Sequence, residues 1–193
     1  MRSLINRKDD SKRNQLILGI FLIIIMLFST LGYALGGKNK EDSNKKVEYN
    51  GIEFIQDNSG YWNFNIQGTD FMTKYNPEEL EDIDFFTDLN INAYSNNPLY
   101  LVSEFDEPNY ELGRNLKNFI LRMQKACLSK EDCLNGLPVK NCSVDNIIVI
   151  QEPLAETDSE TIYQQENCVY ILANLENQTR YADKFLFRIL RIE

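Results

Sequence analysis

The stretch Tyr-Trp-Asn-Phe-Asn-Ile-Gln, residues 61–67, alternates large apolar side chains with polar ones. Such alternation is typical of a strand with one buried face, which here would carry Trp62, Phe64 and Ile66. Turn-forming residues flank the stretch on both sides, at 57–60 and 68–70. Together with candidate strands at 52–56 and 71–75, the stretch predicts an antiparallel β-meander. We interpret its aromatic row as facing the core rather than as a binding platform.

Helices are expected between the later strands. Asn76-Pro77-Glu78-Glu79 has the pattern of a helix start, with an Asn cap and Pro at the first position, for a short helix that ends near Ile83. A long helix is expected over 110–129, because apolar residues recur at helical spacing: Leu112, Leu116, Phe119, Ile120, Met123 and Cys127. Further strands are predicted at 99–105, 147–151 and 168–173, and a terminal helix at 179–192.

These elements define the expected fold class. The long helix between strands 99–105 and 147–151 suits a right-handed crossover. We therefore predict one α+β domain over residues 50–193, in which the meander is extended into a mixed sheet and the helices lie mostly on one face.

An apolar segment near the N-terminus, Leu16–Leu35, contains 20 residues without a charge. As a helix it would be about 30 Å long, which matches the hydrocarbon core of a bilayer. We predict a retained transmembrane anchor here, after a basic segment at 1–15 and before a flexible polar linker at 36–49. The alternative is a signal peptide that is cleaved after Ala34.

The orientation of this anchor depends on features outside its flanks. Five Lys or Arg precede the segment and four follow it closely, so the positive-inside rule is nearly balanced. Four cysteines and two Asn-x-Ser/Thr acceptors, Asn141 and Asn177, favour an N-terminus in the cytoplasm and a C-terminal domain outside the cell membrane. The expected lipid partner is the bilayer around Leu16–Leu35.

The cysteines indicate disulfides rather than a metal or redox site. The four cysteines are Cys127, Cys133, Cys142 and Cys168, and no two of them have the Cys-x-x-Cys spacing of a zinc or redox site. Four cysteines can pair in three ways. The pairing that fits the predicted elements best joins 127 to 133 and 142 to 168. The alternative is four reduced thiols in a cytosolic domain.

Charge and composition exclude several chemistries. Residues 1–49 carry nine Lys or Arg and five Asp or Glu, a balance of +4, whereas residues 50–193 carry eleven and 24, a balance of −13. So acidic a domain would repel nucleic acid, and we expect no nucleic-acid partner. The chain has no histidine, which removes Ser-His-Asp and Cys-His catalysis and His-ligated metals. The acidic residues between 78 and 88 lack EF-hand spacing, and we assign no cofactor and no metal.

Three functions are compatible with these features. We expect a non-catalytic interaction or assembly module outside the membrane, with a protein partner. The alternatives are an accessory subunit of a membrane complex and a carboxylate-based hydrolase that acts on glycans. The hydrolase would use Glu104 and Asp106, near Tyr100, as acid and base.

Several short motifs add a resemblance. They are Asn50–Phe54, Pro77–Leu80, Leu137-Pro138 followed by Cys142, Asn167–Ile171 and Lys184–Leu190. In these the chain resembles a group of uncharacterised small archaeal single-pass membrane-anchored proteins. The resemblance implies a membrane anchor and implies no particular activity.

Overall fold

The computed structural model describes residues 8–36, 45–131, 133, 136–155 and 159–192. The chain divides into two compact units, Met1–Ser43 and Asn44–Glu193, and each is described by itself. Parts of the predicted basic segment (1–7) and of the predicted linker (37–44) lie outside the described residues.

The first unit contains one helix, α1, which spans Lys8–Gly36 and so includes the predicted anchor. Its side chains are described from Arg13 to Phe28. The large apolar side chains between Leu16 and Phe28 are all exposed, by 43–73%. Within the part of the chain that the structure describes, no helix is both long and apolar enough to cross a membrane.

The second unit begins with a four-stranded antiparallel meander, which we call sheet A. Its strands follow in chain order: β1 (Lys46–Tyr49), β2 (Ile52–Gln56), β3 (Trp62–Ile66) and β4 (Thr69–Thr73). Asn50 and Gly51 both have positive φ in the β1–β2 turn, which is the requirement of a type I′ hairpin. Trp62, Phe64 and Phe71 are buried, as the alternation predicts. Lys46–Tyr49, expected as linker, is therefore a strand.

A second, five-stranded mixed sheet, sheet B, has the order β6-β5-β7-β9-β8. Its strands are β5 (Pro98–Ser103), β6 (Arg122–Lys125), β7 (Asn146–Gln151), β8 (Thr161–Gln165) and β9 (Cys168–Leu172). The pairs β5–β6, β5–β7 and β7–β9 are parallel, and β8–β9 is antiparallel. The sheet therefore ends in two edge strands, β6 and β8.

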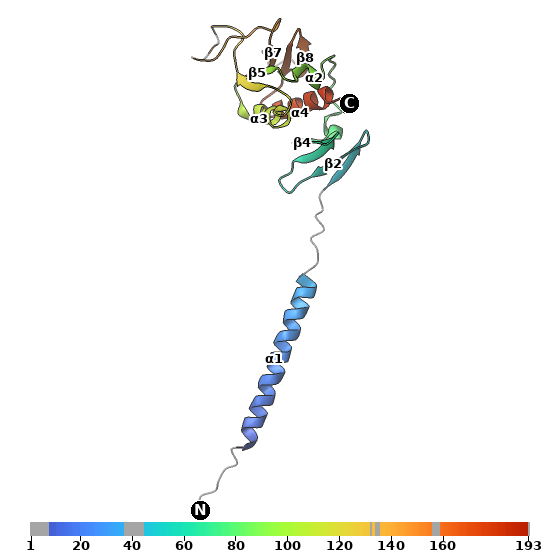
Figure 1. Ribbon diagram of the computed structural model, residues 1–193, viewed down its shortest axis with the longest axis vertical. Coiled ribbons are helices and arrows are strands. Elements are labelled where there is room, and N and C mark those ends of the chain that lie inside the picture. Colours follow the sequence, from blue (N-terminus) through green and yellow to red (C-terminus); the bar gives the residue numbers. More distant parts are fainter. Residues whose placement is uncertain (1–7, 37–44, 132, 134–135, 156–158, 193) are drawn as a thin grey trace, which may run out of the picture. The chain divides into compact units, whose positions relative to one another are not determined.

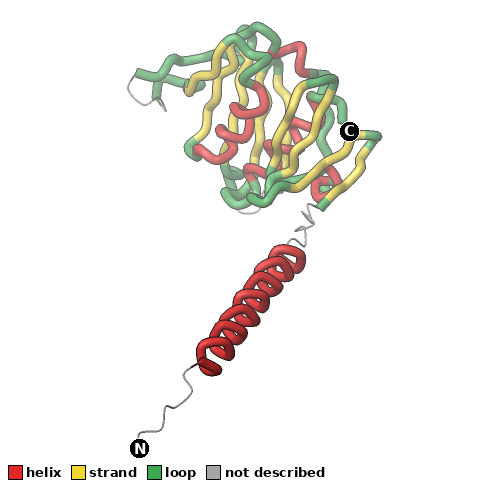
Figure 2. Tube along the Cα trace, turned by 60° about the horizontal axis from the view of Figure 1, so that its bottom comes forward, coloured by secondary structure: helices red, strands yellow, loops and turns green. Residues whose placement is uncertain are grey.

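Two helices, α3 (Asp106–Leu116) and α4 (Gln178–Ile189), lie between the sheets (Figures 1 and 2). Most of α4 is buried because it packs on both sides. Phe187 contacts Phe54 and Phe64 of sheet A, and the same core cluster includes Ile148 and Ile171 of sheet B. A 3-10 turn (Pro77–Leu80), capped by Asn76 as predicted, and the short α2 (Ile91–Tyr94) complete the layers.

The expectation that the meander extends into the mixed sheet is wrong, and the edge of β4 shows why. The Asn115 side chain accepts a hydrogen bond from Met72 N at 2.9 Å and donates one to Met72 O at 2.8 Å. Asp183 Oδ2 accepts from the backbone N–H groups of Lys74 and Tyr75, each at 3.0 Å. Helix side chains thus satisfy the backbone at this edge, where a fifth strand would have paired.

The expected helix 110–129 is also wrong in both bounds. It begins at Asp106, since Pro108 is tolerated in a first turn that needs no N–H from it, and it ends at Leu116. Backbone bonds from Asn96 N to Phe119 O and from Leu121 N to Asn97 O then turn the chain into β6. Tertiary pairing with β5 outweighs the local helical pattern.

Strand β8 was expected as a loop, because its sequence is polar.

Candidate functional site

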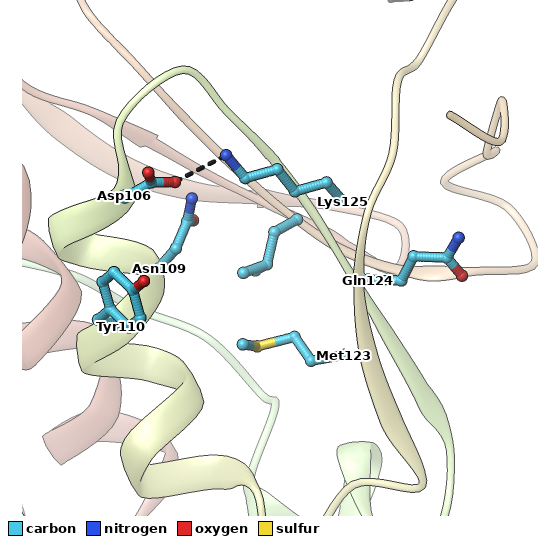
Figure 3. A pocket seen from close by; sticks show the side chains of 7 residues that line it. Asp106, Asn109, Tyr110, Met123, Gln124 and Lys125 are labelled. Atoms are coloured by element: carbon cyan, nitrogen blue, oxygen red, sulfur yellow. Dashed lines mark hydrogen bonds and ion pairs between the residues drawn. The ribbon is translucent and has the colours of Figure 1, made fainter. Parts of the chain in front are cut away.

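A cleft of about 240 Å³ lies between α3 and the β5–β6 edge of sheet B (Figure 3). Asp106, Asn109 and Tyr110 of α3 face β6 across it, and its other lining residues are Leu101, Met123, Gln124 and Lys125. An ion pair at 2.7 Å between Lys125 Nζ and Asp106 Oδ1 closes one end. The cleft is therefore apolar inside and charged at its rim.

Local sequence explains why these side chains meet. Strand β5 ends at Ser103, whose hydroxyl accepts from Phe105 N at 3.2 Å and donates to Phe105 O at 2.9 Å, and α3 begins at the next residue. Gly113 provides the close approach between the helix and β6, because a Cβ there would collide with the methyl of Met123. Any side chain at 113 would therefore displace Met123 from the cleft.

Asn109 gives the cleft an unsatisfied hydrogen-bond acceptor. The residue is only 7% exposed, and its Nδ2 donates to Phe105 O at 2.7 Å. Its Oδ1 is buried and has no hydrogen-bond partner among the described residues. A buried acceptor without a donor is costly, so Asn109 lowers the stability of this wall of the cleft.

The chain around β6 is basic, although the domain is acidic. Residues 113–130 hold five of the eleven Lys or Arg of residues 50–193 and no Asp or Glu. All four side chains of β6 are exposed. The guanidinium of Arg122 donates to the hydroxyl of Tyr100 at 3.0 Å, and Lys140 Nζ lies 4.0 Å from the centre of that ring. The positive charge therefore lies on both faces of the edge strand.

The residues of the proposed hydrolase do not assemble. Glu104 and Asp106 are both exposed, and only Asp106 lines the cleft. Tyr100 belongs to the cluster on the opposite face of sheet B, with Ile147 and Val149. A buried, convergent acid pair is therefore not formed by these two carboxylates.

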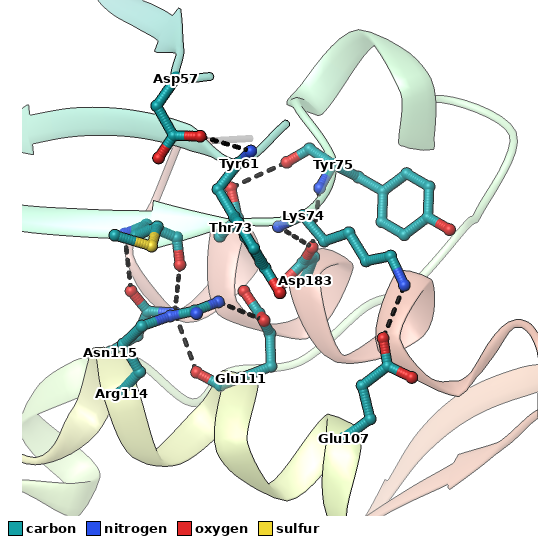
Figure 4. Close-up of polar contacts among 11 residues, drawn as sticks. Asp57, Tyr61, Thr73, Lys74, Tyr75, Glu107, Glu111, Arg114, Asn115 and Asp183 are labelled. Atoms are coloured by element: carbon teal, nitrogen blue, oxygen red, sulfur yellow. Dashed lines mark hydrogen bonds and ion pairs between the residues drawn. The ribbon is translucent and has the colours of Figure 1, made fainter. Parts of the chain in front are cut away.

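Another pair of carboxylates, which the sequence analysis missed, is buried between α3, α4 and β4 (Figure 4). Glu111 is 3% exposed and forms an ion pair with Arg114, whose guanidinium lies 4.6 Å from the Tyr61 ring centre. Burial raises the pKa of Asp183 well above its usual range, and Glu111 adds to the effect. Burial also raises the pKa of Glu111, against the attraction of Arg114. An aspartate within the apolar pattern of α4 was the signal that could have identified this pair.

Both disulfides join the pairs that fit the sequence best, Cys127–Cys133 and Cys142–Cys168. The two sequons differ in environment. Asn141 is exposed, whereas the Asn177 amide donates to both carboxylate oxygens of Glu160, at 3.0 and 2.9 Å, and Thr179 is 4% exposed. Over the described ranges, no group of three or more Cys, Asp or Glu side chains is placed to hold a metal ion.

Comparisons with protein families, with curated proteins and with solved structures found no match for this chain. The resemblance to archaeal membrane-anchored proteins therefore stays a prediction. What the geometry defines is a three-layer α+β domain with two disulfides, in which one cleft lies beside an exposed edge strand.

Proposed function

We propose that this chain is a membrane-anchored protein whose C-terminal domain, outside the cytoplasm, binds another protein without catalysis. One observation carries the binding role: the cleft beside α3 lies next to the edge strand β6, whose four side chains are all exposed. A bound polypeptide supplies N–H donors along its backbone, and the apolar interior of the cleft accepts its side chains.

The anchor is supported by the apolar surface of α1. Side chains such as Leu18, Phe21 and Phe28 are exposed by 59–73%, and burying apolar area in lipid stabilises by about 25 cal/mol per Å². Two disulfides fit an oxidising compartment, which supports a location outside the cytoplasm for the second unit.

Membrane anchoring can be tested by charge insertion. Replacing Ile20 and Ile24 by Lys would cost about 3 kcal/mol for each charge placed in the bilayer. We expect the parent chain to stay with membranes after alkaline carbonate treatment and the double Lys variant to be extracted. A double Leu variant at the same positions is the control. A parent chain that is itself extracted would refute the anchor.

The binding role can be tested by site-specific crosslinking of the full chain in its native host. A photo-crosslinking amino acid replaces Tyr110, which lines the cleft and is 74% exposed, or, as a control, Leu154, which is 89% exposed. We expect a discrete crosslinked product from position 110 alone, and we expect the partner in that product to bind the purified chain. The proposal fails if position 110 gives no product, or if both positions give the same ones.

A further inference from the structure

Strand β6 offers a specific mode of binding, which rests on the function proposed above. We infer that β6 accepts an acidic, extended segment of a partner protein as an additional strand of sheet B. The cleft beside α3 then receives the side chains of that segment that point toward the helix.

The backbone of β6 has no strand paired with its outer side among the described residues. Just past the end of β6 the edge is covered, because Cys127 N donates to Pro138 O at 3.1 Å and Lys140 N donates to Cys127 O at 2.8 Å. Ala126 N donates to Leu101 O at 2.9 Å, so the alternation of a strand directs the N–H and C=O groups of Met123 and Lys125 away from β5. These two residues also line the cleft. An added strand would therefore gain backbone hydrogen bonds beside the site where its side chains are received.

The positive charges of β6 favour an acidic partner segment. Arg122 and Lys125 are three positions apart on the strand, so their side chains project from opposite faces. An ammonium has three donors and a guanidinium five, so each can bind an incoming carboxylate while it keeps its bond to Asp106 or Tyr100. The best match is a segment with two acids three positions apart.

The same charges disfavour a second copy of this chain. In antiparallel self-pairing of β6, Arg122 would lie opposite Lys125 of the copy, and in parallel pairing each cation would lie opposite its equal. Like charges on directly opposed strand positions are destabilising. Basic edge strands are a known protection against self-association, and here they leave an acidic partner as the complementary one.

The test uses the purified full chain in detergent micelles and labelled eight-residue peptides of Val and Thr. One peptide carries two Glu residues three positions apart, a second carries them two positions apart, and the others have Gln or Lys in place of Glu. We expect the first peptide to bind, the second and the Gln peptide to bind about ten-fold more weakly, and the Lys peptide not to bind. Binding should weaken as salt is raised.

Variants of the chain locate the binding. Met123→Pro removes one outward N–H without loss of a bond to β5, and it should abolish binding, whereas Met123→Leu should keep it. Arg122→Gln with Lys125→Gln should reduce binding about ten-fold. Lys45→Gln with Lys46→Gln, the same charge change at the start of β1, should leave binding unchanged. Circular dichroism confirms that each variant is folded.

Three results would overturn the inference. They are equal binding of the Glu and Gln peptides, binding that Met123→Pro leaves intact, and a dimer of the parent chain that Met123→Pro dissociates. If any of these occurs while position 110 still crosslinks to a partner in cells, the binding role stands and only the strand-addition mode fails.

Discussion

The carboxyl groups of Asp183 and Glu111 lie close together between α3 and α4, so that a single proton would let one donate a hydrogen bond to the other. Two carboxylates both accept, so this bond requires a proton. Asp183 Oδ1 and Glu111 Oε1 are the oxygens of this pair that have no hydrogen-bond partner among the described residues. Because Asp183 Oδ2 accepts from Lys74 and Tyr75, the proton is best placed on Asp183 Oδ1, which donates to Glu111.

This pair predicts how stability depends on pH. The pKa of Asp183 is raised in the folded state, so its contribution is fully present below about pH 4, the unfolded value, and is lost as pH rises toward the folded pKa. Asp183→Asn keeps both backbone bonds and donates permanently to Glu111. We expect it to be more stable than the parent at pH 7 by about 1 kcal/mol and to show a flatter pH dependence. Urea unfolding, followed by Trp62 fluorescence at several pH values, measures the free energy of unfolding and its pH dependence.

Asp183→Ala is the matched control for that variant. It leaves the N–H groups of Lys74 and Tyr75 buried without an acceptor, so we expect a loss of about 2–4 kcal/mol. If Asn and Ala at this position destabilise equally at pH 7, the shared proton is wrong.

The two hydrogen bonds between the Asn115 side chain and the backbone of Met72 give a second prediction about stability. Asn115→Ala removes both bonds at the β4 edge and should cost about 1–3 kcal/mol in urea unfolding. Asn118→Ala, at an exposed position just beyond α3, should change stability by less than about 0.5 kcal/mol. Equal effects at the two positions would contradict the role given to Asn115.

The two disulfides should contribute unequally. Cys142–Cys168 closes a loop with a separation of 26 residues and Cys127–Cys133 one of 6. Loop-closure entropy predicts that replacing the longer bridge by two Ala residues costs about 1 kcal/mol more than replacing the shorter one. Urea unfolding midpoints of the two double Ala variants measure the loss of stability. A larger loss of stability when the shorter bridge is removed would refute this ranking.

The sequons provide a test of topology. When the full chain is synthesised with microsomal membranes, we expect one glycan, at Asn141, because Asn177 and Thr179 are held at the start of α4. A mobility shift that a glycosidase reverses measures it. Asn141→Gln should abolish the shift and Asn177→Gln should leave it. A chain without any glycan would place the domain on the other side of the membrane.

Local patterns were sufficient for the elements with one buried face. The alternation around Phe64, the cap at Asn76 and the apolar run at Ile147–Ile150 all lie in elements of the expected type. Strands β6 and β8 were missed because both lie at an edge of sheet B, where half-exposed positions carry polar residues without a clear period. Strand β6 exists because it pairs with β5, which precedes α3 in the chain, and β8 exists because it forms a tight antiparallel hairpin with β9.

The site was harder to predict for the same reason. Asp106 was selected because it follows a strand, but its partner Lys125 was assigned to a helix face. Asn109 and Asp183 carry no motif, and their meaning depends on burial between elements that are far apart in the chain. Neither burial nor an unsatisfied oxygen can be read from residue type alone.

The position of α4 in the middle layer has a consequence for biosynthesis. This helix is made after every strand that it packs against, so the inner faces of both sheets stay exposed until residue 189 has been synthesised. In the topology proposed above, the domain would therefore be translocated as an unfolded chain and reach its core afterwards. All four cysteines are synthesised before α4. They would therefore be exposed to the oxidising compartment before the core that buries Cys168 has formed.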